Sequence, residues 1–423
     1  MSVLALRPAP RGGCEPGSAP GWQSLTTLPR PWVAAAFAGC AVFAGAVAEF
    51  STTPLHRRWG TMAVGAYALA AIAVLAWKSH GVHVALLVSL GGALIAPLSW
   101  MAAVERWQPE VSVMARSAQL LIQHGTPYQS AAVIAAAHDP NAYNPYLPAL
   151  IVFGIPRALW GDNPLTDPRI WIGVVSLGLL ILAFVVARAP DVIRWMGFVA
   201  ASPVIAFALS VSGIDLPELA LICLGLALLW ERPGKPSRPV LAGLVLGVAV
   251  AMKATTWPAL IVVIAMLARR DGRRATVSFS TAALGVFAAI VVPVLVVEPA
   301  SLMRNTVVFP LGLTRVKTQA ASPLPGHLIA STGIVGHWIA IALLLLGGLA
   351  IAASLVIRPP RDVPSATWRL IIGLTLMFSF APATRFGYFM YPLGIWAWLQ
   401  VSSLARRSAT VSEPAHADAP LAT

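Results

Sequence analysis

The chain has 423 residues, of which 58% are apolar and 11% are charged, and its mean hydropathy is +0.77. Soluble domains carry about a quarter charged residues, so the composition excludes a soluble enzyme and indicates an all-α, polytopic membrane protein. The formal charge of +13 lies in short links between apolar segments, which is typical of membrane topology and argues against a nucleic-acid partner.

The chain divides into one membrane domain and two tails. Residues 1–30 and 405–423 combine Pro, Gly, Ala and charged residues, and we expect them to be disordered and cytoplasmic. The apolar segments between them, over residues 31–404, predict about 11–13 transmembrane helices. Three cysteines, two of them inside apolar segments, predict neither a disulfide framework nor a metal site.

Basic links give two conflicting predictions of topology. The links 231–238, 269–274 and 358–361 all read as cytoplasmic, which makes 239–268 a hairpin with Lys253 at its outer tip. Counting crossings forward from a cytoplasmic N-terminus instead places 231–238 outside. The two counts differ by one, so one apolar segment is re-entrant or interfacial, and the short, proline-bounded segment 145–160 is the first candidate.

The longest polar stretch, residues 103–144, is the expected extracytoplasmic loop. Apolar residues recur there in steps of three and four, at Val111, Met114, Ala118 and Leu121. Pro109 suits a first helical turn and Gly125 suits the position after the last turn. The pattern predicts an amphipathic helix on the membrane surface.

Several motifs then occur in an order that resembles a known family. They are Pro109–Met114, His124–Tyr128, Asp215 after Ser212-Gly213, and Gly243–Gly247 leading to Lys253 and Pro258. Over about residues 100–270 the chain resembles the polyprenyl-phosphate-sugar-dependent GT-C glycosyltransferases, and is most similar to family eighty-seven, which holds actinobacterial mannosyltransferases. It departs from the family pattern at Glu110, where an aspartate is usual, and at Met114, where a tyrosine is usual.

The resemblance implies a reaction, its partners and a location. A sugar, mannose in the first instance, would pass with inversion from a polyprenyl-phosphate donor to a hydroxyl of a lipid or glycan acceptor, at the outer face of the plasma membrane. A carboxylate would take the proton of that hydroxyl, and cations would hold the departing phosphate. No cofactor is implied, although a divalent cation is compatible with the reaction, and membrane lipids are the remaining expected partners.

Two carboxylates are candidates for the catalytic base. Glu110 is the first candidate and Glu105 is its substitute. A carboxylate in a first helical turn is also favoured by the helix dipole alone, so capping is an equally good explanation of Glu110.

The expected substrate-binding residues are Lys253, Arg385, Asp215, Tyr128, Tyr388 and Arg304. Lys253 ends an apolar run, and because a charge at depth is costly it either faces a cavity or partner, or snorkels to the interface. Arg385 lies in a short outer turn, where it either contacts a phosphate or pairs with Asp215. Arg304, like Arg315 and Lys317, lies in the second outer loop, 299–327, and would contact a lipid phosphate or anionic headgroups.

Two other functions remain open from the sequence. The first is a multi-pass transporter or flippase of lipid-linked sugars, and the second is a scaffold that has lost catalysis. A long outer loop with a surface helix and a carboxylate favours the enzyme. Broken central helices and an internal repeat would favour a transporter, and we find no repeat.

Overall fold

The structure is a computed structural model that describes residues 29–231, 236–316 and 318–411, with side chains as far as 404. Most of both predicted tails, and Lys317, therefore lie outside the described residues. Within the described residues every regular element is a helix, and the one β-type contact is an isolated bridge between Ala321 and Thr384. The all-helical, multi-pass prediction is confirmed.

Seven helices are long and apolar enough to cross a membrane among the described residues. They are α1 (Arg30–Phe50), α2 (Pro54–Ala76), the continuous run of α3, η1 and α4 (Gly81–Ala103), α8 (Pro168–Ala187), α14 (Gly272–Val297), α17 (Ile334–Ile357) and α18 (Val363–Phe380). An eighth span results if α9 (Val192–Ala201) and α10 (Pro203–Val211), bent by 60° at their junction, count as one. The expected number of 11–13 was therefore too high by this measure.

Short helices account for the difference. The apolar segments at 145–160, 214–230 and 239–252 fold as η3 with α7 (Pro148–Gly154 and Ile155–Trp160), α11 (Leu216–Leu229) and α12 (Pro239–Val250). Each is shorter than the roughly 20 residues that cross a hydrocarbon core. Two further helices, α13 (Trp257–Arg270) and α19 (Met390–Val411), complete the bundle.

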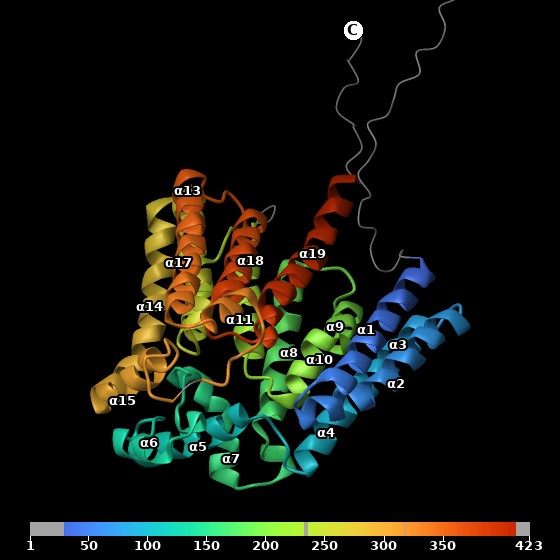
Figure 1. Cartoon of the computed structure of the whole chain (residues 1–423). Coiled ribbons are helices and arrows are strands. Elements are labelled where there is room, and N and C mark those ends of the chain that lie inside the picture. Colours follow the sequence, from blue (N-terminus) through green and yellow to red (C-terminus); the bar gives the residue numbers. More distant parts are fainter. Residues whose placement is uncertain (1–28, 232–235, 317, 412–423) are drawn as a thin grey trace, which may run out of the picture.

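A helix is present at the predicted place as α5 (Pro109–His124). It begins at the predicted Pro109, and Gly125 follows it in the left-handed conformation with φ of 70°. Val111, Met114 and Ala118 are buried, as expected of the apolar face. With α6 (Ala131–Ala137), α7 and α15 (Pro299–Met303), α5 lies at one end of the bundle, at the bottom of Figure 1.

The two basic links after α11 and α13 lie together at one end of the bundle. The Arg270 guanidinium lies 3.2 Å from Glu231, and the Ser237 hydroxyl donates to Asp271 at 2.9 Å. Helices α12 and α13 consequently form the predicted hairpin, with Lys253 at the end remote from both links. The segment 145–160 packs on α5 and not across the bundle, which removes the extra crossing from the forward count.

A close approach of two helices positions the hairpin. Gly243 and Gly247 face α14, and a Cβ added at Gly247 would lie 2.7 Å from the Ala283 carbonyl oxygen. A Cβ at Gly243 would collide with the Phe279 carbonyl oxygen. Small residues four apart let helix backbones touch in membranes, so α12 needs glycine at both positions.

Candidate functional site

Four charged residues from distant parts of the chain form two ion pairs at the ends of their helices. Glu110 lies in the first turn of α5 and Arg385 in the turn between α18 and α19. Asp215 directly precedes α11, and Lys253 lies between α12 and the short η5 (Ala254–Thr256). The four residues were all predicted from the sequence as site residues.

Arg385 pairs with Glu110. Its Nη1 donates to Glu110 Oε1, while Glu110 Oε2 is buried and has no hydrogen-bond partner among the described residues. The start of α5 has no side-chain cap, and the hydrogen bond to Glu110 comes from 275 residues away. Glu110 therefore makes no capping hydrogen bond, and its place in the first turn of α5 is one that the helix dipole favours.

Electrostatics keeps the arginine of this pair in its charged form. Burial alone would lower the pKa of Arg385, but the neighbouring Glu110 and Tyr388 outweigh burial and the pKa of Arg385 lies above its ordinary value. Arginine remains protonated at any pH that the protein meets, so the pair has a permanent positive member. The charge of Glu110 is thereby balanced locally.

Lys253 pairs with Asp215. Nζ lies 2.5 Å from Asp215 Oδ1, and the Tyr391 hydroxyl donates to the same oxygen at 2.9 Å. Only 11% of the Lys253 side chain and 16% of the Asp215 side chain are exposed. Nζ also lies 4.8 Å from the ring centre of Tyr388 and 5.6 Å from that of Tyr146. Lys253 thus has a partner at depth and does not snorkel.

Tyr146 connects the two pairs. Its pKa is raised well above the ordinary value, first by burial and then by the negative charge of Glu110, with Asp215 contributing further. Both carboxylates therefore lie close enough to act on the same phenol. The arrangement brings two cations, two carboxylates and aromatic rings together.

One predicted pairing is wrong. A salt bridge between Arg385 and Asp215 was one explanation of that arginine, but Arg385 pairs with Glu110 and Asp215 pairs with Lys253. Glu110 and Asp215 carry the same charge, so the pairing follows from which carboxylate the fold brings close to each cation.

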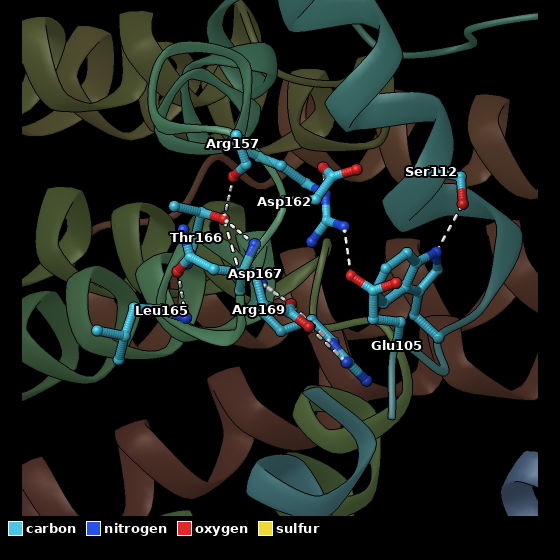
Figure 2. A network of polar contacts seen from close by, with 11 residues as sticks. Glu105, Ser112, Arg157, Asp162, Leu165, Thr166, Asp167 and Arg169 are labelled. Carbon is cyan, nitrogen blue, oxygen red and sulfur yellow. Dashed lines mark hydrogen bonds and ion pairs between the residues drawn. The ribbon is translucent and has the colours of Figure 1, made fainter. Parts of the chain in front are cut away.

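Glu105 lies outside this group, in a network shown in Figure 2. It is 55% exposed and pairs with Arg157 at 3.1 Å. Its φ of 53° ends α4: the amide of Glu105 donates to Ala102 and that of Arg106 donates to Met101, as in a Schellman cap. Its conformation and its arginine partner give Glu105 a role in the turn.

Tyr128 and Arg304 do not join the two pairs directly. The Tyr128 side chain is buried, and its hydroxyl donates to the Tyr146 carbonyl at 2.9 Å. Arg304 begins η6 (Arg304–Val308) and is partly exposed. The next residue, Asn305, accepts from the Asn144 amide at 2.7 Å. Tyr128 thus supports the loop that carries Tyr146, and Asn305 supports its beginning.

Sequence reasoning missed two nearby residues. Glu218 is fully buried, and neither carboxylate oxygen has a hydrogen-bond partner among the described residues. Its signal was available, because a second carboxylate three residues after Asp215 in an apolar segment is expensive and hence informative. His56, whose Nε2 lies 2.5 Å from Gln108 Nε2, comes from α2 and carried no such signal.

The described residues contain no group of three or more His, Cys, Asp or Glu side chains placed to hold a metal ion. Comparison with known proteins gives one match: a family model described as glycosyltransferase family 87 matches residues 144–382, more than half of the chain. No curated protein and no solved structure matches. The matched range contains Tyr146, Asp215 and Lys253, whereas Glu110 and Arg385 lie outside it.

Proposed function

Because the chain belongs to glycosyltransferase family 87, and so is a multi-pass membrane transferase with a sugar donor and an acceptor, we propose the details of its reaction. The donor is a polyprenyl-phosphate sugar, with mannose as the sugar, and the acceptor is a hydroxyl of a lipid or glycan. Transfer takes place at the extracytoplasmic face of the plasma membrane and inverts the anomeric carbon.

Glu110 is the proposed base, and one observation carries this assignment. Its Oε2 is buried without a hydrogen bond while Oε1 is held by Arg385. An unsatisfied buried carboxylate oxygen is costly, and an acceptor hydroxyl that donates to it would remove this cost. The hydroxyl proton then passes to Glu110, the acceptor oxygen bonds to the anomeric carbon, and the bond from that carbon to the phosphate oxygen breaks.

Arg385 and Lys253 are proposed to hold the phosphate. Breaking the sugar–phosphate bond adds negative charge to the phosphate, and cations fixed in a region of low polarity stabilise that charge strongly. Arg385 can offer two parallel hydrogen bonds to phosphate oxygens, and Lys253 offers a compact charge. Both already lie beside the Tyr388 and Tyr146 rings that enclose the site.

A transporter or flippase of lipid-linked sugars is the second candidate. The bent pair α9–α10 favours it, because broken helices are common in transporters. The two functions differ in one measurable respect. A transferase moves the sugar onto another molecule, whereas a flippase moves the intact lipid-linked sugar across the membrane.

The test is an incubation of membranes with a radiolabelled polyprenyl-phosphate mannose. Wild type should transfer label to an acceptor, and Glu110→Gln should lower turnover by about 10²–10⁴-fold at unchanged protein level. Glu49→Gln is the matched control, because Glu49 is exposed and belongs to the end of α1. Retention of more than a third of turnover by Glu110→Gln would refute the base assignment, and loss in Glu105→Gln instead would transfer it to Glu105.

A further inference from the structure

The short segment that leads from α4 into α5 is held far more firmly than a surface loop requires. It consists of residues 105–108 and directly precedes Pro109 and Glu110. Whatever fixes this segment also fixes the first turn of α5, because a helix moves as a rigid unit.

Trp107 is the centre of the segment. Two guanidinium groups lie over its ring, with Arg157 4.8 Å and Arg169 5.8 Å from the ring centre. Its indole N–H donates to the Ser112 hydroxyl at 2.6 Å. Ser112 lies two residues after Glu110 on α5, so the indole connects the two arginines to the helix that carries the carboxylate (Figure 2).

Arg169, the second of these arginines, is itself immobilised. Arg169 and Asp167 are fully buried and form a two-fold hydrogen-bonded ion pair, at 3.0 Å through Nε and 2.6 Å through Nη2. Nη1 of Arg169 donates to the Ser210 carbonyl at the end of α10. A bidentate arginine–carboxylate pair has a fixed geometry, so Trp107 rests on a rigid support made by α8 and α10.

The neighbouring residue, Gln108, is held by contacts of its own. The Gln108 amide donates to the Val211 carbonyl at 3.0 Å, and the Gln108 side chain meets His56 of α2. Trp107 and Gln108 thus join the start of α5 to α2, α8 and α10. None of these contacts includes Glu110 itself.

We propose that Trp107 is a positioning residue that sets the place of the Glu110 carboxylate relative to the acceptor hydroxyl. The inference rests on the function proposed above. Proton removal requires the base within hydrogen-bond reach of the hydroxyl, and a misplacement of about 1 Å can reduce the rate by about 10²-fold. Trp107 acts through Ser112 and the first turns of α5 and does not contact the reacting atoms.

The experiment compares Trp107→Ala, which removes the ring, with Trp107→Phe, which keeps a ring beside the arginines and loses the N–H. In the labelled-donor assay we expect turnover per molecule to fall by about 10–10²-fold for alanine and less for phenylalanine. The KM for the donor should remain within about twofold, because Lys253 and Arg385 are untouched. Trp171→Ala is the matched control, since its indole likewise donates one hydrogen bond, in this case to the Leu165 carbonyl at 3.0 Å.

A second measurement separates positioning from general destabilisation. In a Glu110→Gln background, adding Trp107→Ala should lower turnover no further, because a misplaced base and an absent base have the same consequence. If Trp107 has only a structural role, the loss of turnover in the double variant should be the product of the two single losses. The amount of folded protein should fall in parallel. If Trp107→Ala does not accumulate, Ser112→Ala removes the same connection to α5 at an exposed residue and should reproduce the loss of turnover.

The outcomes distinguish this inference from the proposed function. An inactive Glu110→Gln with wild-type turnover in Trp107→Ala and Ser112→Ala would overturn the positioning role and leave the base assignment intact. A fully active Glu110→Gln would overturn the base assignment, and the positioning role with it. A double variant whose loss of turnover equals the product of the two single losses would also overturn the positioning role.

Discussion

Replacing Asp215 by asparagine should leave Lys253 as a buried charge without a counter-ion. The wild-type ammonium lies 2.5 Å from Asp215 Oδ1, and both side chains are less than a fifth exposed. Removing one partner of a buried ion pair costs about 3–5 kcal/mol. The Tyr388 and Tyr146 faces contact the ammonium before and after the change, so they do not alter this difference. We therefore expect a loss of about 3–5 kcal/mol in the free energy of unfolding.

The measurement is the unfolding of purified protein in a fixed detergent, with Lys253→Met and the double change Asp215→Leu/Lys253→Met beside Asp215→Asn. The double change removes both charges and should be more stable than either single change, because no unpaired charge remains. Transfer of labelled sugar should be lost in the two variants that lack Lys253 if Lys253 holds the phosphate, whereas Asp215→Asn keeps the ammonium. Equal stability of wild type and Asp215→Asn would refute the reasoning, because it would mean that water already reaches the ammonium.

Two further predictions concern packing and sidedness. Gly243→Ala should destabilise the protein by about 1–3 kcal/mol through collision with the Phe279 carbonyl, whereas Gly285→Ala, with open space around it, should be neutral in the same unfolding measurement. In a variant with all three cysteines replaced, Phe386→Cys should react with an impermeant maleimide on intact cells and Arg361→Cys only after permeabilisation, since both positions are exposed and the two links are predicted on opposite sides. The reverse pattern would contradict the predicted topology.

Composition and local pattern were enough to predict part of the fold. The scarcity of charge gave the all-helical membrane class, and Pro109 and Gly125 gave the ends of α5. The number of spans was not predictable in this way, because an apolar run looks the same whether it crosses lipid or is enclosed by other helices. Almost every residue of α11 is buried inside the protein, so its apolarity reflects packing against neighbours more than contact with lipid.

The candidate site was predictable as a set of residues but not as a set of contacts. Charges in apolar surroundings stand out in any sequence, which is how Glu110, Asp215, Lys253 and Arg385 were singled out. Their pairing depends on how α5, α11, α12 and the turn before α19 meet, and no local pattern carries that information. Glu218 shows the converse: its signal was present in the sequence, and its full burial without a hydrogen-bond partner among the described residues became visible only in the fold.

The ion pair of Arg385 and Glu110 determines which contacts the two substrates have to replace in the proposed reaction. In the structure Arg385 pairs with Glu110 Oε1, so a donor phosphate has to compete with Glu110 for Arg385, and an acceptor hydroxyl can donate to the carboxylate. Either exchange alone would leave one buried charge without a partner, which is unfavourable. Both together lower this cost, because the phosphate pairs with Arg385 and the hydroxyl gives the Glu110 carboxylate a hydrogen bond. The base therefore becomes available when both substrates are in place, provided that the start of α5 keeps the carboxylate at a fixed position. Trp107, whose ring lies beside Arg157 and Arg169, is the residue that supplies this constraint in our proposal.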